Sequence, residues 1–181
     1  MNQNQANLLD QCRILVLDDS PLMLELIKTC LTAFNVKETV TVEDPVVCMD
    51  LLCNSLFDAL IIDWRLRDVD GLDLVRQIRR NLPDPLRRIP IILCTGYSEY
   101  DRVLEAGDAG IHEMLCKPVT SKELYLKLTS ALTSDRRFVE TADYIGPERR
   151  QRARKLPLYA MKKSRAGVDS ILEDDSDEIF L

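Results

Sequence analysis

The apolar residues of this chain gather in short unbroken runs, separated by longer stretches in which apolar positions recur with helical spacing. Short runs rich in Ile, Leu and Val are typical of strands that are buried on both faces of a parallel sheet. In an open α/β sheet, ligands bind just beyond the carboxyl ends of such strands. Four runs end directly in polar groups at that position: Arg13–Asp19, Ala59–Asp63, Ile91–Thr95 and Glu113–Pro118.

Strand and helix signals alternate along residues 12–135, which predicts an α/β fold with a five-stranded parallel sheet and helices on both faces. The expected strands cover about residues 13–18, 38–42, 58–63, 90–95 and 112–116, the second polar enough to be an edge. The last four helices are expected over about residues 45–55, 72–82, 98–107 and 121–133. Helix-start signals stand at Ser20-Pro21, Asp44-Pro45 and Thr120–Glu123.

Charge is distributed unevenly along the chain. Residues 1–135 hold 14 Lys/Arg and 21 Asp/Glu, a net of −7, whereas residues 136–165 hold 10 and 3, a net of +7. Residues 166–181 hold six acidic and no basic residues. This shift and the loss of apolar periodicity place a boundary near residue 135. The expected parts are an N-terminal lead at 1–11, one α/β domain at 12–135, and a charged extension at 136–181, disordered or partly helical.

Composition narrows the class of protein further. The chain has 181 residues, 46% of them apolar, and its net charge of −6 disfavours nucleic acid as a partner of the whole protein. No charged-then-apolar leader and no apolar run of membrane-spanning length is present, so we expect a cytoplasmic protein without membrane insertion. The six cysteines form no Cys-x-x-Cys pair and are expected to be buried, reduced thiols.

The acidic residues at two strand ends are the first candidates for chemistry. Aspartates at strand ends often only cap a helix or form a turn. Ser20 already serves as a cap, however, and the adjacent carboxylates of Asp18 and Asp19 repel each other unless a cation lies between them. Mg²⁺ prefers oxygen ligands, typically one or two carboxylates with waters and phosphate oxygens. With Asp63 at the neighbouring strand end, the sequence predicts a Mg²⁺ site.

Asp63 is also a candidate nucleophile, since an ionised carboxylate can form an aspartyl phosphate if a cation offsets the incoming charge. Thr95 and Lys117 complete the set, although a single threonine or lysine at a strand end is usually a satisfied hydroxyl or a solvated charge. Pro118 restricts the backbone of Lys117. A lysine fixed there can direct its ammonium group toward the acidic residues.

One protein family carries these residue types in this order at successive strand ends, the receiver domain of bacterial response regulators. The chain resembles it over about residues 12–135, and the resemblance implies a doubly wound (βα)5, flavodoxin-like fold. It implies Mg²⁺-dependent phosphoryl transfer from a histidine kinase or phosphotransfer protein, and a regulatory phosphoacceptor rather than an enzyme. The residues that carry the resemblance are Asp18-Asp19, Asp63, Thr95 and Lys117-Pro118.

The resemblance also implies a role for each residue. Asp19, Asp63 and the backbone carbonyl of Arg65 would bind Mg²⁺, with Asp18 acting largely through water. After transfer to Asp63, Thr95 would hydrogen-bond the phosphoryl oxygens and Lys117 would form an ion pair with them. The downstream protein partner would bind the face formed by the fourth and fifth strands and the helices that follow them.

Three positions depart from the family pattern or modulate it. Members usually carry an aromatic switch residue three positions before the lysine, and this chain has Met114 there. Tyr97, two residues after Thr95, is a candidate substitute for that switch. Arg65, at the second position after Asp63, is expected to affect the lifetime of the phosphoryl group.

Two other classes of function compete with this interpretation. The first is a receiver-like adaptor that acts without phosphorylation and whose basic extension contacts an acidic partner or nucleic acid. The complete set of acidic and basic site residues argues against this alternative. A nucleotide-binding α/β enzyme would need a glycine-rich loop after the first strand, where Asp-Asp-Ser-Pro stands instead. Residues 136–181 hold no unit of a helix-turn-helix domain and no catalytic motif.

Overall fold

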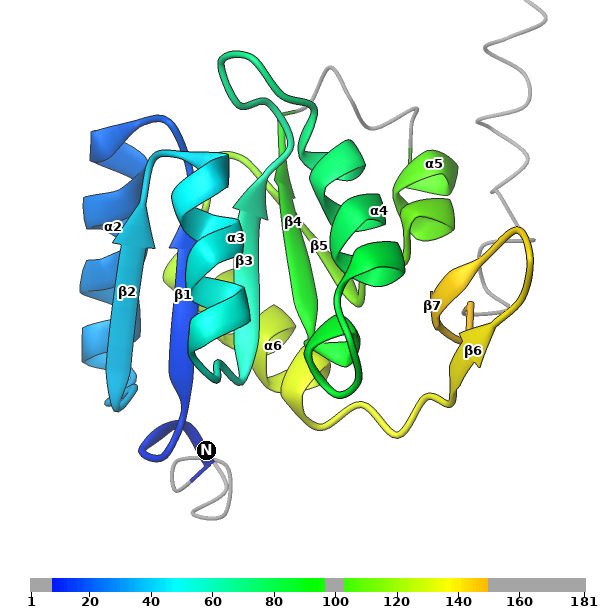
Figure 1. Ribbon diagram of the computed structural model, residues 1–181. Coiled ribbons are helices and arrows are strands. Elements are labelled where there is room, and N and C mark those ends of the chain that lie inside the picture. The colour runs from blue at the N-terminus through cyan, green and yellow to red at the C-terminus, as the bar shows by residue number, and fades with distance from the viewer. Residues whose placement is uncertain (1–7, 97–102, 150–181) are drawn as a thin grey trace, which may run out of the picture. The chain divides into compact units, whose positions relative to one another are not determined.

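The computed structural model describes residues 8–96 and 103–149, without the side chains of 103 and 104. A five-stranded parallel sheet with the order β2-β1-β3-β4-β5 forms its centre (Figure 1). The fold class predicted from the sequence is therefore confirmed, and the polar second strand lies at an edge as expected. The strands are β1 (Arg13–Leu17), β2 (Glu38–Val42), β3 (Ala59–Asp63), β4 (Ile91–Thr95) and β5 (Glu113–Cys116).

Helices cover both faces of the sheet and separate its core into two apolar clusters. One cluster joins the sheet to α2 and α6, and the other joins it to α3, α4 and α5. Every residue of β3 and β4 is buried, because these central strands are covered on both sides. The helices are α2 (Pro21–Ala33), α3 (Pro45–Asn54), α4 (Gly71–Asn81), α5 (Val103–Ala109) and α6 (Ser121–Leu132).

Side-chain caps fix where four of these helices begin. The first backbone N–H groups of a helix have no partner within it, and a Ser, Thr or Asp oxygen at the N-cap accepts from one of them. The three helix starts predicted from the sequence are confirmed, and Asp70 adds a fourth. The caps Ser20, Asp44, Asp70 and Thr120 accept from the backbone N–H groups of Met23, Val46, Leu72 and Glu123.

The predicted strands and helices agree with the structure to within one or two residues, with one helix as the exception. Residues 98–102 of the helix expected at 98–107 lie outside the described residues, and α5 continues to Ala109. Ala106 and Ala109 are buried there, and Gly110 follows with a positive φ of 94°. A short 3-10 turn at Leu86–Arg88, which the sequence did not suggest, leads into β4.

A β-hairpin follows α6 in the stretch where the sequence analysis expected a charged, irregular extension. It consists of β6 (Phe138–Glu140) and β7 (Ile145–Pro147), and the compact unit runs to Glu148 rather than ending near residue 135. A Cβ atom on Gly110 would collide with the carbonyl oxygen of Ile145, so glycine allows the hairpin to lie against the corner between α5 and β5. Strands this short carry no periodicity that the sequence analysis could have used.

A buried arginine on α4 holds the hairpin to the domain. Arg79 is 1% exposed, and burial lowers its pKa to about 9, which leaves the guanidinium protonated at neutral pH. It donates hydrogen bonds to the carbonyl oxygens of Gly110, at 3.0 Å, and Arg87, at 2.6 Å. The Phe138 ring of β6 lies 5.7 Å from this guanidinium and 4.9 Å from that of Arg88. A buried cation thus gains its partners from carbonyls and an aromatic face.

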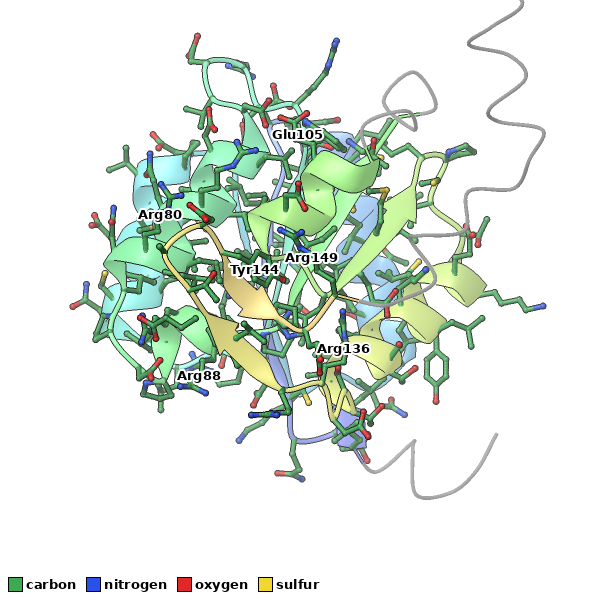
Figure 2. All side chains as sticks on the ribbon, turned by 90° about the vertical axis from the view of Figure 1, so that its right-hand side faces the viewer. Arg80, Arg88, Glu105, Arg136, Tyr144 and Arg149 are labelled. Atoms are coloured by element: carbon green, nitrogen blue, oxygen red, sulfur yellow. The ribbon has the colours of Figure 1, made fainter. Side chains whose placement is uncertain are left out.

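Further polar contacts tie the hairpin to neighbouring elements. Arg87 forms an ion pair with Glu140 of β6, with 2.8 Å between Nη2 and Oε2. Arg136 donates to the carbonyl oxygen of His112 at 2.7 Å, next to the start of β5. Figure 2 faces the hairpin and shows the side chains of Arg88, Arg136 and Tyr144 around it. The hairpin therefore belongs to the compact unit through contacts with α4, the 3-10 turn and the β5 corner.

We expect Phe138→Ala to lower the free energy of unfolding by about 1–2 kcal/mol, since two guanidiniums lose an aromatic partner. The measurement is urea denaturation of the full chain. Leu126→Ala is the matched control, because Leu126 is 54% exposed on α6 and its removal should change the free energy by less than about 0.5 kcal/mol. Equal effects of the two substitutions would show that the hairpin does not stabilise the domain.

Candidate functional site

The parallel sheet brings the predicted polar residues to one edge. Asp63 is the last residue of β3 and lies beside Cys94, while Thr95 ends β4 and lies beside Cys116 of β5. Asp18 follows β1, whose last residue is paired with Ile62. Because all five strands run in the same direction, their carboxyl ends meet there, as the sequence analysis expected.

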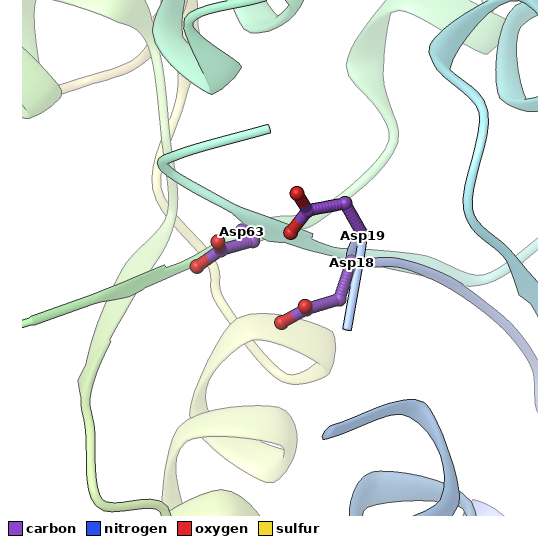
Figure 3. A group of neighbouring side chains, drawn as sticks. All are labelled: Asp18, Asp19 and Asp63. Carbon is purple, nitrogen blue, oxygen red and sulfur yellow. The ribbon is translucent and has the colours of Figure 1, made fainter. Parts of the chain in front are cut away.

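Three carboxylates lie close together at this edge. Ligand oxygens of Asp18, Asp19 and Asp63 all lie within 4.8 Å of one another, and Figure 3 shows the three side chains close together at this edge. Asp18 and Asp63 are 1% and 6% exposed, whereas Asp19 is half-buried. Like charges about 4 Å apart repel by about 4 kcal/mol at an effective dielectric constant of about 20. Such a group of oxygen ligands suits a hard divalent cation such as Mg²⁺.

Lys117 supplies a positive charge to two of the three carboxylates. Its Nζ lies 2.7 Å from Oδ1 of Asp63 and 3.0 Å from Oδ2 of Asp18. The backbone N–H of Lys117 donates to the carbonyl oxygen of Thr95 at 2.7 Å, and the Lys117–Pro118 peptide bond is cis. Two attractive pairs do not cancel three repulsive ones, so the cluster keeps a net negative charge that favours a further cation.

The pKa values of Asp63 and Lys117 are both raised, the first by burial and the second by its hydrogen bonds to carboxylates. Burial raises the pKa of Asp63, and the hydrogen bond from Lys117 offsets only part of that shift. Burial lowers the pKa of Lys117, but its hydrogen bonds to Asp63 and Asp18 outweigh this, so its pKa lies above the ordinary value. Both groups thus hold protons more tightly in the folded protein than in the unfolded chain.

The loop between β3 and α4 covers one side of the cluster. Trp64 and Leu66 point into the apolar core, and Arg65 and Arg67 are exposed. Gly71 ends the loop and donates to the carbonyl oxygen of Trp64 at 2.7 Å. A Cβ atom at residue 71 would collide with the carbonyl oxygen of Asp63. Glycine is required there because α4 begins against the backbone of the strand that carries Asp63.

The remaining predicted residues differ in how they relate to the cluster. Thr95 is fully buried at the end of β4, and its hydroxyl donates to the carbonyl oxygen of Gly96 at 3.2 Å. Met114 lies beside Leu93 and packs, half-buried, against the apolar cluster that contains α4 and α5. Tyr97 lies outside the described residues. Arg65 is in the covering loop, directly after Trp64.

Sequence reasoning missed two residues that shape this site. Arg67 forms an ion pair with Asp19, with 3.7 Å between Nε and Oδ2, although its sequence context is only that of a charge in a loop. The close contact of Gly71 with the backbone of Asp63 follows only from the structure, because a glycine in a loop is a common turn signal. The sequence does not distinguish Arg67 from Arg65, because the conformation of the loop decides which arginine lies near Asp19.

Fold and site together define an α/β domain with acidic residues and one lysine at the carboxyl ends of parallel strands. Comparison with known families supports this class. The sequence model described as the response regulator receiver domain matches residues 14–129, more than half of the chain. The chain therefore belongs to the response regulator receiver family, whose domains are regulatory phosphoacceptors of two-component signalling rather than enzymes.

Individual relatives agree with this assignment. Chemotaxis protein CheY of Pseudomonas aeruginosa is 29% identical over 116 residues, which are 64% of this chain and 92% of that protein. A CheY homolog of Campylobacter jejuni is 33% identical over 121 residues, 66% of this chain and 92% of that protein. Both matches include the receiver unit.

Solved structures show the same fold. A putative response regulator from Chloroflexus aurantiacus superposes with a TM-score of 0.64 at 22% identity, covering 68% of this chain and 99% of that one. The receiver domain of a sensor histidine kinase from Pseudomonas aeruginosa has a TM-score of 0.60 at 26% identity, with coverage of 68% and 99%. That structure is described with a magnesium ion coordinated in its active-site cleft. In the described part of our chain, no helix has the length and apolar character to cross a membrane.

We expect Asp63→Asn to stabilise the metal-free protein at pH 7, since burial raises the pKa of Asp63 and folding therefore favours a neutral side chain at this position. Protonated Asp63 stabilises the fold, because its pKa is higher in the folded protein than in the unfolded chain. This stabilisation is complete below the unfolded-state pKa of about 4 and is lost as the pH rises through the folded-state pKa. The difference between the two proteins should therefore vanish below about pH 4. Urea denaturation across pH measures it.

Asp50→Asn is the control for this experiment, because Asp50 is exposed on α3. This substitution should leave the free energy of unfolding nearly unchanged at every pH. A metal-free Asp63→Asn protein that is less stable than the parent at pH 7 would contradict the predicted direction of the pKa shift.

Proposed function

We propose that this protein is a response regulator that accepts a phosphoryl group on Asp63 from a histidine kinase or phosphotransfer protein. One observation carries the proposal: the buried carboxylate of Asp63 lies 2.7 Å from Nζ of Lys117, and its ligand oxygen lies within 4.8 Å of those of Asp18 and Asp19. This arrangement provides a nucleophile, ligands for a cation and a positive charge for the product. Membership in the receiver family supports the same reaction.

The donor atoms at this edge fit Mg²⁺, because all three side chains offer carboxylate oxygens. Asp19, Asp63 and the backbone carbonyl of Arg65 would hold the ion, and Asp18 would act largely through water. When bound, Mg²⁺ supplies positive charge that offsets the charge of the incoming phosphoryl group. Asp18 is already occupied by the backbone N–H of Ser20 at 2.9 Å and by Lys117, which favours this secondary role.

In the transfer, a carboxylate oxygen of Asp63 attacks phosphorus and forms a P–O bond. The P–N bond of the donor phosphohistidine breaks, and the imidazole leaves with its electron pair. Lys117 then exchanges its contact with the carboxylate for one with the phosphoryl oxygens. Because Lys117 also binds Asp18, it remains anchored at the site through this exchange.

The fold also suggests how the product is detected. Thr95 ends β4 next to β5, and its hydroxyl would turn from the carbonyl of Gly96 toward a phosphoryl oxygen. Met114 occupies the β5 position where the family usually has an aromatic residue, so packing of a flexible aliphatic side chain replaces rotation of a ring. We assign the downstream protein partner to the face of β4, α5, β5 and α6. Tyr97 lies outside the described residues and stays a candidate for the same signal.

Phosphorylation is tested by incubating the protein with Mg²⁺ and an acyl phosphate such as acetyl phosphate, and measuring intact mass. The parent protein should gain one phosphoryl group, and Asp63→Asn should gain none, because the amide is not a nucleophile at this site. Asp58→Asn is the control, since Asp58 precedes β3 at the opposite end of the strand. Stoichiometric phosphorylation of Asp63→Asn would refute the assignment.

Metal binding is tested separately, by isothermal titration calorimetry with MgCl₂. Asp19→Ala should weaken Mg²⁺ binding by at least about tenfold, because it removes a direct carboxylate ligand worth more than about 1.4 kcal/mol. Asp18→Ala should weaken it less. The assignment of ligands is wrong if Asp19→Ala keeps the parent affinity, or if Asp18→Ala has the larger effect.

A further inference from the structure

Asp19 differs from the other two carboxylates in its partner. Lys117 contacts Asp18 and Asp63, while the ion pair of Asp19 within the described ranges is with Arg67, at 3.7 Å. That distance exceeds hydrogen-bond length, so the attraction between these two groups is electrostatic. Asp19 is also the most exposed of the three, with 28% of its side chain accessible. A cation that enters the cluster therefore meets a carboxylate whose charge is already partly compensated.

The loop conformation explains why Arg67 reaches Asp19. Leu66 is 7% exposed and anchors the loop in the core, and its N–H donates to the carbonyl oxygen of Val69 at 3.3 Å. A β-bridge between Arg65 and Asp70 closes the base of the loop. Arg67 follows the anchored leucine, so its side chain points outward and is 72% exposed.

Arg67 and Asp19 also line the same cavity, an open space of about 540 Å³ between the loop and the end of β1. Water and ions reach Asp19 from this side, in contrast to the buried Asp18 and Asp63. Arg67 is thus placed where an ion would approach. Among the described residues, Lys117 contacts two carboxylates of the cluster, whereas Arg67 contacts one.

We propose that Arg67 is a positioning residue that neutralises Asp19 while no metal is bound, competes with Mg²⁺ for this carboxylate, and thereby sets the Mg²⁺ affinity. The proposal rests on the function proposed above, in which Asp19 is a Mg²⁺ ligand. Mg²⁺ and the guanidinium repel each other across Asp19, so Mg²⁺ binding weakens the ion pair with Arg67, and the ion pair in turn weakens Mg²⁺ binding. Since the pair is exposed, its influence is modest, up to about fivefold in affinity, and it weakens with salt.

The test is calorimetric titration of the full chain with MgCl₂ at low ionic strength. Arg67→Gln should bind Mg²⁺ about two- to fivefold more tightly than the parent, and Arg67→Lys, which keeps the charge, should stay closer to the parent value. Arg80→Gln is the matched control, because it removes the same charge from an exposed position on α4. Added NaCl should reduce the difference between Arg67→Gln and the parent.

A double-mutant cycle separates competition at Asp19 from a general effect of charge. In an Asp19→Asn background, where the carboxylate is absent, Arg67→Gln should change the remaining Mg²⁺ affinity by less than in the parent background. An unchanged or weaker affinity of Arg67→Gln would overturn the proposal, as would an equal gain in Arg80→Gln. If the parent protein binds Mg²⁺ and Asp19→Ala does not, these failures leave the proposed function intact. A parent protein that binds no Mg²⁺ overturns both.

Discussion

Mutual repulsion among three carboxylates at the edge of the sheet is the constraint on which the rest of this structure depends. Asp18, Asp19 and Asp63 lie within 4.8 Å, and two of them are buried. The fold tolerates this repulsion because buried parallel strands and capped helices hold the backbone around the three carboxylates in place. Lys117 and Arg67 reduce the repulsion without removing it. The remaining negative charge attracts a divalent cation, and burial of Asp63 raises its pKa, so this carboxyl group binds a proton more tightly than it does in the unfolded chain.

The second feature of the molecule lies at the other end of the sheet. The hairpin of β6 and β7 packs near the start of β5. There the buried guanidinium of Arg79 donates to two carbonyl oxygens and lies near the ring of Phe138. Burying a charge is costly unless it is well solvated by such groups. The hairpin thus completes the environment of Arg79 and extends the compact unit to Glu148. The acidic site lies at the carboxyl ends of the strands, and the contact with Arg79 lies near the start of β5, at the other end of the sheet.

Much of this fold was predictable because strong local signals agree with the global topology. Unbroken apolar runs marked the central strands, and the Ser20-Pro21 and Asp44-Pro45 pairs marked helix starts. The strand ends then brought the acidic residues together through topology alone. The hairpin was not predictable, since three-residue strands have no readable period and Arg79 appears in sequence as one more charge on a helix. The pairing of Arg67 with Asp19 likewise depends on a loop conformation that residue spacing does not specify.

The most direct measurement of the central claim is the titration of the Asp63 carboxyl carbon by ¹³C NMR, first without metal and then with Mg²⁺. The crowded, buried site predicts a pKa above the ordinary aspartate value in the metal-free protein. Added Mg²⁺ should lower that pKa, because a bound divalent cation stabilises the ionised carboxylate. A pKa at or below the ordinary value without metal, or one that Mg²⁺ leaves unchanged, would contradict this account.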